Sequence, residues 1–180
     1  MSSDTINESL KDLIYVTAHE QMHVMQRKKP ELFKKLYLEH LNFKQGSLIL
    51  DKKYKKLIRS NPDTRLTPEN EFLYDNGNGD YYYLNAFFKN NQPDNLGDVD
   101  YLGIKCDLTR KDNKNVFTST DKAIKLKDFS DFSRFFGLTG NHYHPNEISA
   151  ELIALHYTNR NKEPSPALMK IGRWLRNNIV

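Results

Sequence analysis

The sequence predicts an α+β fold in a single domain spanning residues 1–180. Segments near both ends carry apolar residues at the three- and four-residue spacing of α-helices. The stretch 46–120 is interrupted by turn signals and holds short strand-like runs, so it is interpreted as an insertion or a sheet-containing segment. With 38% hydrophobic residues the chain can bury a core, and its ten Tyr and ten Phe should supply much of it.

A first helix is expected to begin near Thr5, which forms a T-x-x-E capping box with Glu8, and to stop before Pro30. Apolar residues at helical spacing predict its buried face, which comprises Leu10, Leu13, Ile14, Ala18, Met22 and Met25. A second helix is expected over residues 31–43, and its inward side chains are Leu32, Phe33, Leu36, Tyr37 and Leu41.

Turns and short strands are expected in the middle of the chain. Residues 61–63 and 75–80 are turn signals, because Asn, Asp, Gly and Pro favour the backbone conformations of turns. Residues 81–88 and 99–106 fit short strands, although the first run also fits a helix. Residues 90–98 are expected to form a loop.

The C-terminal part predicts three further helices. A short aromatic helix should cover residues 128–136. The next helix should open at Pro145, since proline suits a first helical turn, and it carries Glu147 and Glu151 one turn apart. A last, basic helix should run through Trp174.

The first helix contains an HExxH motif formed by His19, Glu20 and His23. Side chains at positions i and i+4 of a helix lie on one face, so the two histidines can bind one metal ion. Glu20 projects about 100° round the helix from His19, where it can reach a water molecule on the metal. Zinc lowers the pKa of such a water to near 7, so Glu20 can act as a general base at neutral pH.

A catalytic zinc site usually has three protein ligands and one open position. Glu147 is the strongest candidate for the third ligand, because a helix that starts at Pro145 directs it from the first turn. The alternatives for this ligand are His142, His144 and His156. Glu151, one turn further on, can accept a hydrogen bond from a ligating imidazole. Three residues close to Glu147 in sequence could stabilise an oxyanion, and the sequence does not choose among Tyr143, His142 and His156.

The run AHEQMHVMQR resembles the active-site helix of zincin metallopeptidases. The run PNEISAE resembles the helix that carries the glutamate ligand in gluzincins, where an acidic residue follows four positions later. The segments HVMQR, NPD and YHPNEISAE are also similar to uncharacterised HExxH proteins of large DNA viruses. The resemblance implies a zinc-dependent metallopeptidase that cleaves a peptide or protein substrate.

The same resemblance implies a zincin-like fold, in which the active-site helix and the Glu-ligand helix pack together with a small sheet or an irregular middle segment. Zincins place a β-sheet before the active-site helix, whereas only eighteen residues precede His19. Either the chain is a truncated form, or its sheet is built from the middle segment. Two other function classes stay open: a zinc-binding regulatory or interaction module without peptidase activity, and a DNA-associated protease.

Charge and cysteine content bear on partners and location. The formal charge of +4 is mild and the lysines are spread along the chain, which favours a solvated surface over a nucleic-acid site. No apolar run approaches the roughly 18 residues that span a bilayer. Cys106 is the single cysteine and the N-terminus has no signal-peptide pattern, so we expect an intracellular, cytoplasmic protein, in the host cytoplasm if viral.

Overall fold

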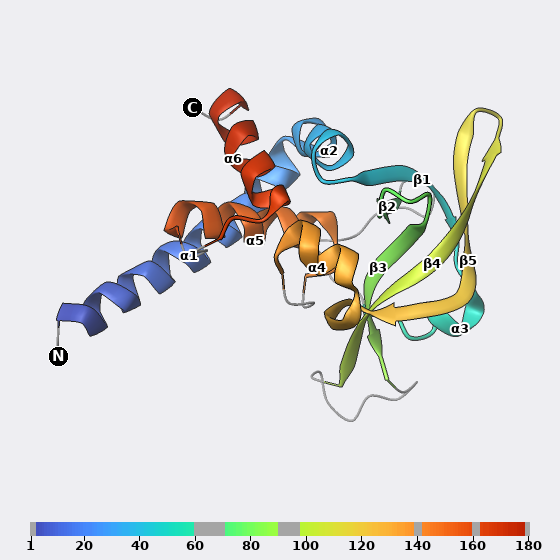
Figure 1. The fold of residues 1–180 in the computed structure, drawn as a ribbon, viewed down its shortest axis with the longest axis horizontal. Helices are drawn as coiled ribbons and strands as arrows, with labels where there is room; N and C mark the ends of the chain where they lie inside the picture. The colour runs from blue at the N-terminus through green and yellow to red at the C-terminus, as the bar shows by residue number, and fades with distance from the viewer. Residues whose placement is uncertain (1–2, 60–70, 90–97, 139–141, 160–162, 179–180) are drawn as a thin grey trace.

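The helices gather on one side of the molecule and the strands on the other (Figure 1). This computed structural model describes residues 3–59, 71–89, 98–138, 142–159 and 163–178, without the side chains of residues 3–8. The Thr5–Glu8 capping box, the turn signal at 61–63 and nearly all of the loop at 90–98 therefore lie outside the described residues.

The long helices follow the sequence pattern closely. Helix α1 spans Ser3–Lys28 and α2 spans Pro30–Glu39, so the proline separates them as expected. Helix α5 spans Pro145–Thr158, with its proline in the first turn, and α6 spans Pro166–Asn178. The shorter helical pieces are α3, Lys52–Lys55, η2, Leu126–Asp128, and α4, Ser130–Phe136.

The predicted buried face of α1 is wrong for the first half of the helix. Leu13 is 64% exposed and Leu10 is 54% exposed, whereas Met22 is only 8% exposed. The N-terminal half of α1 extends beyond the other elements, and α5 packs across the C-terminal half (Figure 1). Helical spacing identified one apolar stripe along α1, but only the part of it that α5 and its neighbours cover is buried.

In the described residues the strands form a closed barrel with the order β1-β2-β3-β4-β5. Their bounds are Phe43–Ile49, Glu71–Asp75, Tyr81–Phe88, Val99–Lys111 and Lys114–Lys125. Consecutive strands are antiparallel, whereas β1 and β5 pair in parallel. In a meander of five alternating strands the first and last point the same way, so only a parallel pair can close the barrel.

The strands predicted at 81–88 and 99–106 are confirmed, and the second continues to Lys111. The predicted turn at 75–80 is also confirmed, since Gly77 and Gly79 there have positive φ angles. Strands β4 and β5 are joined by Asp112 and Asn113, both with positive φ, as a two-residue type I′ hairpin turn requires. The second predicted helix ends earlier than expected, because Phe43 begins β1.

Strands β2 and β3 are buried on both faces, and this hides their polar–apolar alternation. Successive side chains of a strand point to opposite faces. The residues of these strands that fill the barrel interior are Leu73, Tyr83 and Phe87. Those that pack against the helices belong to the larger core and are Phe72, Tyr74, Leu84 and Ala86. The barrel and the helices therefore share an apolar wall.

The zincin-like fold predicted from the sequence is wrong. The strands of the described residues close into a five-stranded barrel, which differs from the expected small sheet or irregular middle segment. The barrel also follows the HExxH helix in the chain, whereas the zincin pattern places its sheet before that helix. The resemblance was carried by two helices, which constrain only their own packing and not the architecture of the segment between them.

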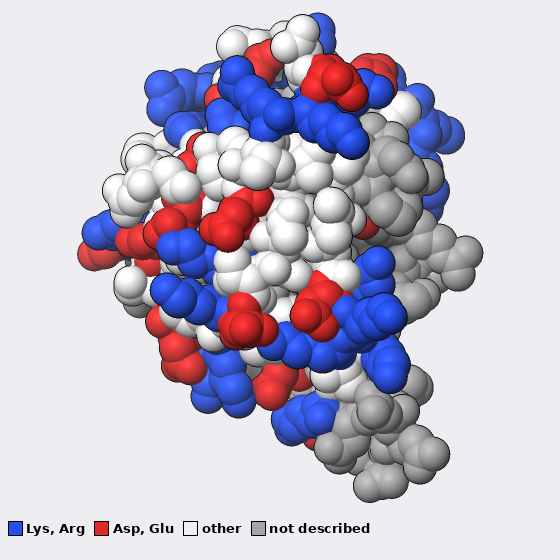
Figure 2. All heavy atoms as spheres, turned by 90° about the vertical axis from the view of Figure 1, so that its right-hand side faces the viewer, with Lys and Arg blue, Asp and Glu red and all other residues white. Residues whose placement is uncertain are grey.

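Lys and Arg side chains are interspersed with Asp and Glu side chains around uncharged residues on the described part of the barrel side of the molecule (Figure 2). Ion pairs formed by residues of the barrel segment include Lys53 with Asp121 and Lys105 with Asp80. None of the helices in the described residues is both long and apolar enough to cross a membrane.

Candidate metal centre

His19 and His23 of α1 meet Glu147 of α5 at one point. The Nε2 atoms of the two histidines are 3.2 Å apart, and Glu147 Oε2 lies 3.6 Å from each of them. The HExxH spacing brings the imidazoles together on one face of α1, and the first turn of α5 directs Glu147 between them. These are the three residues that the sequence analysis selected as metal ligands.

The three atoms have the spacing of ligands around one zinc ion. Zinc–ligand bonds of about 2.0–2.1 Å in a tetrahedron place the ligand atoms about 3.3–3.4 Å apart. The observed separations of 3.2 to 3.6 Å bracket this value. Three protein ligands leave the fourth position open, and the side chains of His19 and Glu147 are each 16% exposed. The donor set therefore fits a zinc site that solvent can reach.

Glu151 contacts His19 on the Nδ1 side of the ring. Its Oε2 lies 3.5 Å from His19 Nδ1, the ring nitrogen that faces away from Glu147. A carboxylate can only accept, so this contact favours the tautomer that leaves Nε2 bare for a metal. Glu151 is itself held by the hydroxyl of Tyr15, which donates to Oε1, and by His142, whose Nε2 lies 3.3 Å from Oε2.

Gln26 plays the equivalent part for His23. Its Nε2 donates to the carbonyl oxygen of Asn146 at 2.9 Å and to Ser149 Oγ at 3.0 Å. Because the Asn146 carbonyl can only accept, the amide oxygen must face His23, and it lies 2.9 Å from Nδ1. The Nδ1 nitrogen is therefore the donor, and Nε2 of His23 is the bare nitrogen directed at the cluster.

The charges of the cluster reinforce one another. Hydrogen bonding to Glu147 and then to Glu151 raises the pKa of His19 to about 9, and the contact with Glu147 also raises that of His23. Burial would raise the pKa of Glu147, but the contacts with His19 and His23 hold it well below its usual range. In the metal-free protein, protons therefore occupy the nitrogens that a metal ion would bind, and a metal ion must compete with them.

His144 fixes the start of α5. It is the residue before Pro145, and its Nδ1 accepts a hydrogen bond from the backbone N–H of Asn146 at 3.2 Å. Burial lowers the pKa of His144 to about 3, so the ring stays neutral and can serve as an acceptor. His144 thus caps the helix that presents Glu147 and does not join the three ligands.

The other predicted site residues lie in different surroundings. Glu20 is exposed on α1 and is not part of the three-residue cluster of the described residues. Tyr143 is buried and stacks on Tyr101 of β4, with ring centroids 5.5 Å apart. His156 faces Gly172 of α6, and it lies nine residues after Glu147, about 13 Å along the helix.

Sequence reasoning missed Gln26 and Tyr15 as supports of the ligands. Tyr15 is one turn before His19 and Gln26 is three residues after His23, so the helical period places both on the ligand face of α1. That signal was present in the sequence. The sequence did not show which α5 residues face Gln26 and Tyr15, because packing sets the register between two helices.

Comparison of the chain with protein-family models, curated proteins and solved structures gave no match in any of the three. The assignment of a function therefore rests on the chemistry of the residues described above.

Proposed function

We propose that this protein is a zinc-dependent metallopeptidase that binds one zinc ion through His19, His23 and Glu147. The observation that carries the proposal is the mutual spacing of their three ligand atoms, 3.2 to 3.6 Å. The buried supports on the Nδ1 side of each imidazole strengthen it, because ligating histidines typically donate their second ring nitrogen to such a partner.

In this proposal zinc would polarise the scissile carbonyl and lower the pKa of a water molecule at the open position. Gln26 accepts a hydrogen bond from His23 Nδ1, and the Glu151 carboxylate lies 3.5 Å from His19 Nδ1, so both favour the tautomer with a bare Nε2. Glu20 follows His19 directly and is exposed, and its carboxylate would accept the proton of the attacking water.

Metal analysis of the purified protein tests the binding step. We expect one zinc ion per chain, and loss of that zinc in His23→Ala. The matched control is His40→Ala, which removes a histidine outside the cluster and should leave the zinc content unchanged. Absence of stoichiometric zinc in the unsubstituted protein would contradict the proposal.

Hydrolysis of a peptide library tests the catalytic step. Glu20→Gln should keep the zinc and lower the rate by about 10²- to 10⁴-fold, since it removes the general base. A Glu20→Gln variant that cleaves peptides as fast as the unsubstituted protein would exclude the assigned role of Glu20.

A second function, a zinc-binding regulatory or interaction module, is favoured by one observation. In zincins a strand of the sheet that precedes the active-site helix binds the substrate backbone. The strands of the described residues instead follow the HExxH helix and close into a barrel. Tight zinc binding without cleavage of any peptide in the library would select this function.

A further inference from the structure

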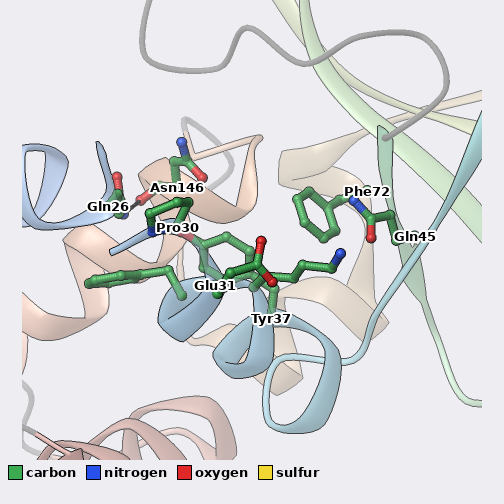
Figure 3. A pocket seen from close by; sticks show the side chains of 9 residues that line it. Gln26, Pro30, Glu31, Tyr37, Gln45, Phe72 and Asn146 are labelled. Carbon is green, nitrogen blue, oxygen red and sulfur yellow. Dashed lines mark hydrogen bonds between the residues drawn. The ribbon is translucent and has the colours of Figure 1, made fainter. Parts of the chain in front are cut away.

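A pocket of about 320 Å³ opens where the end of α1, helix α2, strands β1 and β2 and the start of α5 meet. Gln26 and Asn146 lie on one side of it, and Phe72 and Gln45 lie on the opposite side (Figure 3). At roughly 30 Å³ per water molecule, this volume corresponds to about ten waters. The pocket therefore has room for a small molecule.

One wall of the pocket is aromatic. The rings of Tyr37 and Phe72 meet edge to face with centroids 5.4 Å apart, and Pro30 and Phe33 extend the same apolar lining. Tyr37 and Phe72 are almost fully buried and belong to the core shared by the helices and the barrel. Packing holds this wall in place, so the small part of it that faces the pocket, together with the exposed Pro30, is a preformed apolar surface for a side chain.

Two opposite charges line the same pocket. Glu31 and Lys34 are three residues apart on α2, so they lie on one face of the helix together with Tyr37. Within the described part of the chain neither side chain has an ion-pair partner. A carboxylate and an ammonium beside an apolar wall match the ammonium, carboxylate and side chain of an amino acid.

We propose that this pocket binds a free apolar α-amino acid. Glu31 pairs with the ligand ammonium, Lys34 pairs with its carboxylate, and the wall of Tyr37 and Phe72 takes the side chain. This site is separate from the proposed zinc ligands, and it goes beyond the proposed peptidase activity. None of the three ligands lines the pocket, although Gln26 and its partner Asn146 do, so occupation of the pocket does not require zinc.

Binding of three probes to the full chain, with and without zinc, tests the proposal by calorimetry or NMR titration. The probes are L-phenylalanine, phenylalaninamide, which lacks the carboxylate, and N-acetyl-L-phenylalanine, which lacks the ammonium. We expect L-phenylalanine to bind, and each blocked form to bind roughly tenfold or more weakly, because each loses one charge-assisted contact. L-serine, which lacks the apolar side chain, should also bind more weakly.

Substitutions on α2 assign each contact. Lys34→Ala should weaken L-phenylalanine binding roughly tenfold and leave phenylalaninamide unchanged, because that probe has no carboxylate to lose. Glu31→Ala should likewise weaken L-phenylalanine and leave N-acetyl-L-phenylalanine unchanged. The matched controls are Lys35→Ala and Glu39→Ala, which remove exposed charges of the same helix outside the pocket and should change nothing.

Three results would overturn the proposal. One is no binding of L-phenylalanine at millimolar concentration by the folded, unsubstituted protein. Another is equal affinity for L-phenylalanine and either blocked form, which would show that the zwitterion is not recognised. The third is an equal loss of affinity in Lys35→Ala and Lys34→Ala, which would place the ligand outside this pocket.

Discussion

At the scale of single residues, Gln26 links the two helices of the metal cluster. Its amide connects the His23 ring with the Asn146 carbonyl and the Ser149 hydroxyl, and it is only 6% exposed. A buried amide whose oxygen and nitrogen both form hydrogen bonds fixes the orientation of the side chains that it binds. Gln26 therefore determines which nitrogen of His23 is available to a metal.

Replacing Gln26 by Ala should weaken zinc binding by about 10- to 100-fold, the usual cost of losing a group that orients a ligand. The measurement is competition with a chelator, together with the visible spectrum of the cobalt-substituted protein. Gln21→Ala is the matched control, because Gln21 is an exposed glutamine of the same helix. Unchanged zinc affinity in Gln26→Ala would show that Gln26 does not orient the ligand.

The charge of His19 predicts a pH dependence of zinc binding. Its pKa is raised to about 9 in the metal-free protein, so below that pH zinc must displace a proton. The apparent affinity should rise with pH up to about 9, by about tenfold per pH unit for one displaced proton. Glu151→Gln removes one cause of the shift and should move the plateau to lower pH. A flat affinity between pH 7 and 9 would contradict this assignment.

At the scale of elements, the two halves of α1 should respond differently to truncation of an apolar side chain. Met22→Ala should lower the free energy of unfolding by about 2–5 kcal/mol, because it leaves a cavity against the core. Leu13→Ala should change it by less than about 0.5 kcal/mol, since Leu13 is 64% exposed.

Urea denaturation of both variants at one protein concentration provides the measurement. If Leu13→Ala lowered the free energy of unfolding as much as Met22→Ala, the first half of α1 would have to be packed against other residues in solution.

Helix positions could be predicted from this sequence because their signals are local. Pro30 and Pro145 mark helix starts, and the HExxH spacing puts His19 and His23 on one face without knowledge of the fold. The strand pairing could not be predicted in the same way. Residues 72–74 and 83–87 are buried on both faces. Apart from Asn85 they are apolar or aromatic, so they lack the alternation that identifies a half-buried strand.

At the scale of the whole molecule, the metal cluster and the barrel depend on one core. Phe72 and Tyr74 of the barrel and Ile148 of α5 belong to the same buried cluster. The ligands come from α1 and α5, and the entire barrel lies between these helices in the chain. Helix packing brings Glu147 to the histidines, and the outer face of the barrel supports that packing. This arrangement predicts that barrel closure and the metal cluster are lost in one transition.

Gly46 is the position at which closure can be tested. It pairs with Glu71 of β2 while the next residue, Ser47, pairs with Val116 of β5. A Cβ atom at residue 46 would lie 2.5 Å from the Asn115 carbonyl oxygen, so β1 and β5 must separate to accept it. Gly46→Ala should therefore lower the free energy of unfolding by about 1–3 kcal/mol, the usual cost of overpacking.

Gly103→Ala is the matched control within the same barrel. Its added Cβ would meet no backbone atom at close range, only side-chain methyl groups of Leu84 at 3.3 Å, Ile124 at 3.5 Å and Leu126 at 3.6 Å. We expect it to be close to neutral, since alanine also loses less backbone freedom than glycine. Denaturation is followed by circular dichroism and by zinc release. Within each protein, unsubstituted or Gly46→Ala, the two signals should change at the same denaturant concentration. If Gly46→Ala lost its barrel signal while zinc stayed bound, the barrel would not support the packing of α1 on α5.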